Sequence, residues 1–145
     1  MTATAIDILL AEDNDDDVVM IREAFEDANL ANIVHVVNDG EEALEYLRRT
    51  GRYRGVRPPG LVLLDINMPK KDGFEVLDEI KTDPQLRHLP VIVLTTSHRE
   101  EDVVRSYSGG AATYVTKPID FHEFQQVVRQ FELYWTLVAR LPEPT

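Results

Sequence analysis

The alternation of strand-like and helix-like segments constrains the fold of this chain more than any other feature of its sequence. Five apolar runs have the composition of β-strands, at residues 6–10, 33–37, 61–64, 91–94 and 114–115. After each run, apolar residues recur every three or four positions, as on one face of an amphipathic helix. These helical segments lie at 18–28, 40–47, 74–80, 100–107 and 120–141. The pattern therefore predicts five β/α units.

The strand runs are apolar at successive positions and not only at alternate ones, most clearly at 61–64 and 91–94. Such strands are buried on both faces, as in a parallel sheet that helices cover on both sides. The predicted fold class is thus α/β, with a five-stranded doubly wound parallel sheet. In such sheets the functional groups lie in the crevice beyond the carboxyl ends of the strands. The residues that follow each strand are therefore the candidates for a site.

The composition excludes several classes of protein. The chain has 145 residues, of which 43% are hydrophobic, and we expect one domain over 1–145 with its core between 6 and 141. Because there is no cysteine, we expect no disulfide and no zinc–thiolate site, and a cytoplasmic location. The net charge of −11 disfavours direct binding to nucleic acid or to an anionic membrane. No apolar stretch approaches the roughly 18 residues of a membrane helix.

Charged side chains gather at the predicted carboxyl ends of the strands. Glu12 and Asp13 follow the first strand, and Asp65 ends the third. Three carboxylates in one crevice repel each other, and the ordinary relief is a divalent cation bound through oxygen. Since the chain has no cysteine and no histidine lies nearby in the sequence, hard oxygen ligands favour Mg²⁺ over zinc. Thr95 ends the fourth strand and Lys117 follows the fifth, which adds a hydroxyl and an ammonium group.

Three further acids, Asp15, Asp16 and Asp17, come directly after this first acidic pair. They fit the first turn of the next helix, where negative charge is favourable. That explanation does not extend to Glu12 and Asp13, which precede the helix. We therefore interpret the stretch as half of a metal site followed by an acidic helix start.

Four of these strand-end motifs together resemble the receiver domains of two-component response regulators. The motifs are Glu12-Asp13, L-L-D-I-N-M-P around Asp65, V-L-T-T-S around Thr95 and Y-V-T-K-P around Lys117. Asp65 and Thr95 are 30 positions apart, and Thr95 and Lys117 are 22 apart, as is usual in that family. The resemblance covers residues 6 to about 135 and implies a flavodoxin-like, CheY-like sheet with strand order 2-1-3-4-5.

The resemblance implies that Asp65 accepts a phosphoryl group from a phosphohistidine of a sensor histidine kinase. It also implies Mg²⁺, held by Asp13, Asp65, the main-chain carbonyl of Asn67 and, through water, Glu12. Lys117 would place positive charge at a phosphate oxygen. Such a module is not an enzyme with a separate substrate, since it catalyses only its own phosphorylation and dephosphorylation.

The resemblance further implies a switch pair, Thr95 and Tyr114. The Thr95 hydroxyl would move toward the aspartyl phosphate, and Tyr114 would rotate into the space that Thr95 vacates. Phosphorylation would then bias two packings that already exist. The alternative is that Thr95 is an ordinary strand-end threonine and Tyr114 a half-buried strand aromatic. A cis peptide bond before Pro118 is also usual in the family.

Within the receivers, the chain resembles the small regulators that are paired with bacterial phytochromes. The shared features are L-L-D-I-N-M-P, V-L-T-T-S, D-G-E-E-A-L-E-Y-L and the tail E-L-Y-W-T-L-V-A-R-L-P. The residues after 141 are too few for an output domain. We therefore expect a stand-alone module that signals through protein partners.

Three other functions stay open on sequence grounds. A haloacid-dehalogenase-type phosphohydrolase also uses Mg²⁺ and an aspartyl phosphate, but it needs an acid two residues after the nucleophile, where this chain has Asn67. A flavodoxin-like binding module needs a Ser/Thr/Gly-rich loop after the first strand, where this chain has acids. A phosphorelay intermediate would use the same site as a receiver but without a switch output.

The last helical segment is apolar nearly all round in its second half, which predicts a homodimer through that helix. The expected interface residues are Phe131, Tyr134, Trp135 and Val138. The alternative is that the end of the helix bends back over the core of its own domain. Five arginines between residues 48 and 57 form a basic loop at the opposite end of the sheet, which is either solvated or a docking site for a partner.

Overall fold

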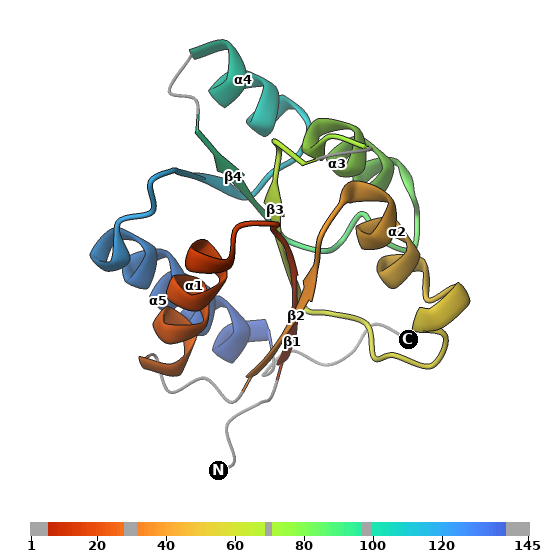
Figure 1. Ribbon diagram of the computed structural model, residues 1–145, viewed down its shortest axis with the longest axis horizontal. Coiled ribbons are helices and arrows are strands. Elements are labelled where there is room, and N and C mark those ends of the chain that lie inside the picture. The colour runs from red at the N-terminus through yellow and green to blue at the C-terminus, as the bar shows by residue number, and fades with distance from the viewer. Residues whose placement is uncertain (1–5, 28–31, 69–70, 97–99, 139–145) are drawn as a thin grey trace.

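The computed structural model describes residues 6–27, 32–68, 71–96 and 100–138 (Figure 1). Its five strands are β1 (Ile6–Ala11), β2 (Asn32–Val37), β3 (Leu61–Asp65), β4 (Val91–Thr95) and β5 (Thr113–Thr116). All neighbouring strands are parallel, and their order in the sheet is β2-β1-β3-β4-β5. The predicted fold class and strand order are confirmed.

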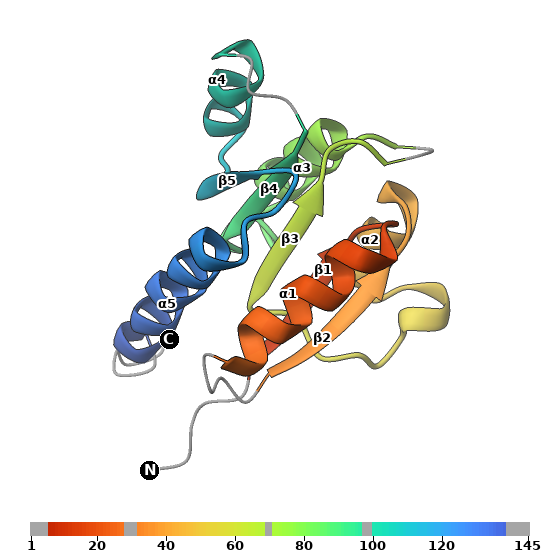
Figure 2. The same ribbon diagram turned by 60° about the vertical axis from the view of Figure 1, so that its left-hand side comes forward.

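Helices lie on both faces of this sheet. They are α1 (Asp15–Asp27), α2 (Gly40–Arg48), α3 (Gly73–Thr82), α4 (Glu100–Ser108) and α5 (Phe121–Val138). Figures 1 and 2 show α1 and α5 side by side on one face and α2 and α3 on the other. A short 3₁₀ helix, η1 (Gly51–Tyr53), was not predicted, because three residues are too few to show a period.

Each central strand divides its side chains between two hydrophobic cores. In β3, Val62 and Leu64 face the core under α2 and α3, whereas Leu61 and Leu63 face the core under α1 and α5. This alternation is the two-residue period of a strand, and all four side chains are fully buried. On the α1 and α5 side, the rings of Phe25 and Phe124 pack edge to face with centroids 6.0 Å apart.

Aspartate side chains cap the amino ends of three helices, α2, α3 and α5. Asp39 accepts a hydrogen bond from the Glu42 N–H (2.8 Å), and Asp72 does the same for α3. At α5, Asp120 accepts from the Glu123 N–H at 3.0 Å, so its carboxylate caps the first turn of that helix. Within the described ranges, no helix is both long enough and apolar enough to cross a bilayer.

Three charged or titratable side chains meet near the amino end of β1. Asp7 is 8% exposed; its carboxylate lies 3.0 Å from Arg57 Nε and 3.5 Å from His35 Nε2. The Tyr53 hydroxyl donates to Glu42 Oε1 at 2.7 Å. The arginine-rich loop thus contacts the end of the sheet remote from Glu12, as its position in the sequence predicted. We call Asp7, His35 and Arg57 the amino-end network; the contact between Tyr53 of η1 and Glu42 in the first turn of α2 is separate from it.

Candidate functional site

The ends of four adjacent strands bring the predicted site residues into one crevice. Asp65 and Thr95 are the last residues of β3 and β4, and Lys117 directly follows β5. Glu12 directly follows β1, and its N–H donates to the Val37 carbonyl (3.0 Å), so it continues the ladder with β2. Because β1, β3, β4 and β5 are neighbours in this order, residues far apart in sequence become adjacent.

Glu12, Asp13 and Asp65 form an acidic cluster in this crevice. One carboxylate oxygen from each lies within 4.8 Å of the others. Glu12 and Asp65 are 0% and 2% exposed, whereas Asp13 is exposed to solvent. Two buried carboxylates beside a third carry a large electrostatic cost unless cations compensate them.

The Lys117 ammonium supplies part of this compensation. Its Nζ lies 2.6 Å from Glu12 Oε2 and donates to Asp65 Oδ2 at 3.0 Å. A third carboxylate also reaches it, since Asp17 Oδ2 is 3.2 Å away. Sequence reasoning assigned Asp17 only to the acidic start of α1. The signal for its second role is its place in the first turn of α1, which directly follows the crevice end of β1.

The protonation equilibria reflect this crowding. Burial and the charge of Asp65 raise the pKa of Glu12 to about 7, although Lys117 opposes that shift. Burial alone would lower the pKa of Lys117, but its contacts with the Glu12 and Asp65 carboxylates outweigh burial, so that pKa is raised. Lys117 is therefore a permanent cation in a site where the carboxylates outnumber it.

The loop after β3 fixes the Asp65 carboxylate. The Asn67 N–H donates to Asp65 Oδ1 at 2.9 Å, and the Asn67 amide donates to Thr96 Oγ1 at 3.1 Å. Gly73, at the start of α3, lies directly against this loop. A Cβ there would be 2.4 Å from Ile66 Cα and 2.8 Å from the Asp65 carbonyl oxygen, so only glycine allows this approach.

The predicted switch residues lie on β4 and β5. Thr95 is 2% exposed, and its carbonyl accepts the Lys117 N–H at 2.7 Å. Tyr114 is half-buried against the core under α2 and α3. Its ring packs edge to face with Tyr107, with the centroids 5.8 Å apart. The peptide bond between Lys117 and Pro118 is cis.

Comparison with known proteins identifies the family. The sequence model of the response regulator receiver domain matches residues 8–129. The chain belongs to the response regulator receiver domain family. This match excludes the two alternatives from other families, a haloacid-dehalogenase-type phosphohydrolase and a flavodoxin-like binding module.

Individual relatives of this receiver domain match over nearly its full length. It is 39% identical to the response regulator Rcp1 of Synechocystis sp., over 93% of this chain and 92% of that protein. It is 41% identical to the probable methanogenesis regulatory protein FilR2 of Methanothrix harundinacea, over 94% of this chain and 88% of that protein.

Solved structures extend the comparison. The phosphorylated cyanobacterial phytochrome response regulator RcpA superposes with a TM-score of 0.82 and 43% identity, over 97% of this chain and 100% of that one. The Mn²⁺-bound form of Rcp1 superposes with a TM-score of 0.79 and 37% identity, over 97% and 99% of the two chains.

The acidic cluster of this receiver domain fits a hard divalent cation. Its donors are carboxylate oxygens, which Mg²⁺ and Mn²⁺ prefer. Moreover, Glu12 Oε2 is buried, and none of the described residues offers it a well-aligned hydrogen-bond donor. Its 2.6 Å contact with Lys117 is therefore one of charge. An incompletely satisfied buried oxygen beside two further carboxylates is what a cation or its bound water would satisfy.

The predicted dimer residues of this receiver domain cannot be placed in the same way. The backbone of α5 is helical from Phe121 to Val138, within the predicted segment 120–141, of which residues 139–141 lie outside the described residues. The side chains of Phe131, Tyr134, Trp135 and Val138 lie outside the described residues.

Proposed function

We propose that this receiver domain accepts a phosphoryl group on Asp65 from a phosphohistidine of a sensor histidine kinase, in a Mg²⁺-dependent reaction. The observation that carries the proposal is the placement of Asp65. It ends the central strand β3 within the acidic cluster, and its two carboxylate oxygens accept from Lys117 Nζ and from the Asn67 N–H. A buried nucleophile flanked by fixed positive charge suits transfer of an anionic group.

In the transfer, an Asp65 carboxylate oxygen attacks phosphorus and forms a P–O bond. The P–N bond to the imidazole breaks, and its electron pair stays on the nitrogen. Lys117, already 3.0 Å from Asp65 Oδ2, neutralises charge on the entering phosphoryl oxygens. Asp13, Asp65, the Asn67 carbonyl and, through water, Glu12 would hold Mg²⁺, which supplies further neutralisation when bound.

Thr95 and Tyr114 would carry the response. Phosphorylation would draw the Thr95 hydroxyl toward the phosphate, and Tyr114 would turn inward from its half-buried position against Tyr107. The fully buried place of Thr95 at the end of β4 and the partial burial of Tyr114 support two alternative packings. A phosphorelay intermediate would take up the phosphoryl group without this rearrangement.

The cognate kinase would be a bacterial phytochrome, acting in the cytoplasm. Support comes from RcpA, which is a phytochrome response regulator 43% identical to this chain, and from the sequence motifs shared with such regulators. The similarity to a methanogenesis regulatory protein means that this pairing has to be tested against other kinases. Output would pass through protein contacts and not through nucleic acid.

The test is incubation of the protein with acetyl phosphate and Mg²⁺, followed by mass spectrometry of the Asp65 peptide. We expect one phosphoryl group on Asp65 and none when the metal is chelated. Phosphorylation at another residue, or undiminished phosphorylation without metal, would refute the proposal. Phosphotransfer from a panel of purified histidine kinases would then identify the donor.

We also propose a homodimer through α5, with Phe131, Tyr134, Trp135 and Val138 at the interface. A helix that covers one sheet needs one apolar stripe, and the apolar residues in the second half of α5 exceed it. Charged substitutions at Tyr134, Trp135 and Val138 should give a folded monomer that still takes up phosphate. Sedimentation of the unmodified protein as a monomer at tens of micromolar, with and without a phosphoryl analogue, would contradict the dimer.

A further inference from the structure

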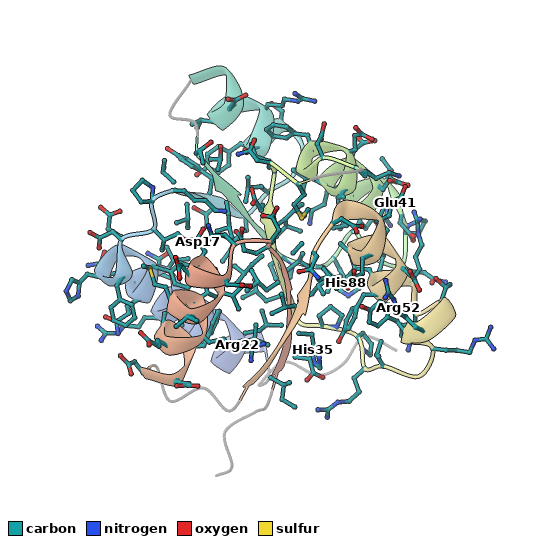
Figure 3. The ribbon with its side chains drawn as sticks, in the orientation of Figure 1. Asp17, Arg22, His35, Glu41, Arg52 and His88 are labelled. Carbon is teal, nitrogen blue, oxygen red and sulfur yellow. The ribbon has the colours of Figure 1, made fainter. Side chains whose placement is uncertain are left out.

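Asp17 differs from the other acids at the start of α1. Its carboxylate lies 3.2 Å from Lys117 Nζ and is 19% exposed. Figure 3 shows it on α1, across the molecule from Arg52. Asp15 and Asp16, immediately before it, are exposed, and neither is ion-paired to a residue that the structure describes.

The Lys117 ammonium thus lies within ion-pair distance of three carboxylates. Nζ lies 2.6 Å from Glu12, 3.0 Å from Asp65 and 3.2 Å from Asp17. An ammonium group has three donors and no more. A phosphoryl group that approaches Asp65 and pairs with Lys117 therefore competes with these carboxylates for the ammonium.

The contact with Asp17 is the least costly of the three to give up. The Glu12 and Asp65 side chains are 0% and 3% exposed, so separating them from the ammonium leaves buried charge unpaired. Asp17 is part-exposed and stands on a helix end, so water can replace Lys117 as its partner.

We infer that Asp17 is a positioning residue that holds the Lys117 ammonium until the entering phosphoryl group takes its place. The inference rests on the proposed function of Asp65 as acceptor. Asp17 restrains phosphorylation because its carboxylate competes with the entering phosphoryl group for the Lys117 ammonium. Loss of this carboxylate accelerates phosphorylation.

The comparison that tests this is Asp17→Asn against Asp16→Asn. Both remove one negative charge from the first turn of α1, but only the first removes a contact with Lys117. With acetyl phosphate and Mg²⁺ in excess, the P–O bond to acetate breaks as the bond to Asp65 forms. We expect Asp17→Asn to react on the order of threefold to tenfold faster than wild type, and Asp16→Asn at the wild-type rate.

A double-mutant cycle shows whether Asp17 acts through Lys117. In a Lys117→Ala background, which we expect to react slowly, adding Asp17→Asn should leave the rate unchanged. Equal rates for Asp17→Asn and Asp16→Asn would overturn the inference. Acceleration that persists without Lys117 would also overturn it, as would a large loss of Mg²⁺ affinity in Asp17→Asn, because Asp17 would then be a metal ligand.

A spectroscopic readout separates failure of this inference from failure of the proposed function. The side-chain ¹H–¹⁵N signal of Lys117 depends on its hydrogen bonds and needs no phosphorylation. We expect it to shift or broaden in Asp17→Asn and to stay in place in Asp16→Asn. If wild type takes no phosphoryl group on Asp65, the proposed function fails. An unmoved Lys117 signal in Asp17→Asn refutes the role of Asp17 itself.

Discussion

The two ends of β1 carry two polar clusters that differ in their balance of charge. At the amino end, the buried carboxylate of Asp7 faces two potential cations, Arg57 at 3.0 Å and His35 at 3.5 Å. At the carboxyl end, the single Lys117 ammonium is shared by three carboxylates, and Asp13 adds a fourth nearby.

The difference indicates that a balanced cluster of buried charges contributes to stability, whereas an unbalanced one marks a binding site. The Asp7 carboxylate is already neutralised by Arg57, so it does not need a further cation. Its contribution is to stability, because the ion pair holds the loop that contains η1 against the sheet. An excess of carboxylates is unfavourable in the folded protein on its own. Its presence in the crevice therefore points to a bound cation that restores the balance of charge.

The largest contrast is expected for neutralising one carboxylate at each end. Asp65→Asn should abolish phosphorylation by acetyl phosphate, because an amide is not nucleophilic here, and should keep the fold. Asp7→Asn, the matched substitution in the amino-end network, should be phosphorylated at close to the wild-type rate. Mass spectrometry and circular dichroism measure the two properties. Phosphorylation of Asp65→Asn at the wild-type rate would place the acceptor elsewhere.

Metal binding should produce the next largest effect. A ligand that binds only the folded state at a hundred times its Kd adds about 2.7 kcal/mol to the free energy of unfolding, so Mg²⁺ should raise the Tm of wild type. Asp13→Ala should lose most of that increase, and Glu12→Ala less, since its contact with the metal is expected through water. Asp7→Asn should keep it in full. An equal metal-dependent rise in Tm for Asp13→Ala and wild type would remove Asp13 from the site.

Much of this organisation could be predicted from the sequence because it depends on periods and on strand ends. The five β/α units follow from the alternation of apolar patterns, and the placement of Glu12, Asp65 and Lys117 follows from where their strands stop. Four widely spaced motifs implied the family, which the comparisons confirmed. Local patterns suffice for features of this kind.

The remaining features depend on contacts between segments that share no pattern. Asp17 belongs to an ordinary acidic helix start, and only the approach of Lys117 from β5 distinguishes it from Asp16. Asp7 is an isolated acid in an apolar strand, and its partner Arg57 lies 50 positions away. Likewise, the need for glycine at position 73 arises from the loop after β3. Such pairings are set by three-dimensional packing, which a single sequence does not display.

The free energy of unfolding should depend more on Arg57, in the amino-end network, than on the exposed Arg54 in the same loop. Arg57→Ala leaves the Asp7 carboxylate, 8% exposed, with His35 as its remaining ion-pair partner among the described residues. We expect a loss of about 1–2 kcal/mol, less than for a fully buried pair because the Arg57 side chain is 70% exposed. Arg54→Ala, at an exposed position in the same loop, should change stability by less than about 0.5 kcal/mol. Urea unfolding measures both, and equal losses would mean that the contact with Asp7 contributes nothing.

The smallest effect is expected at Tyr53, where it appears as a dependence on alkaline pH. Burial and the hydrogen bond to Glu42 raise the pKa of Tyr53 from 10 to about 12. Since the folded state holds this proton more tightly than the unfolded state, the stabilisation is complete below pH 10 and is lost as pH rises toward 12. Tyr53→Phe removes the hydroxyl, so it should lower the free energy of unfolding at pH 8 by about 0.5–1.5 kcal/mol, and this loss should shrink above pH 10.

Urea unfolding of wild type and Tyr53→Phe from pH 8 to pH 11, with Mg²⁺ present and absent, tests this prediction. A cost that stays constant with pH would show that the hydroxyl is not held by Glu42. A cost that changes with Mg²⁺ would show that the contact between Tyr53 and Glu42 is coupled to the acidic cluster.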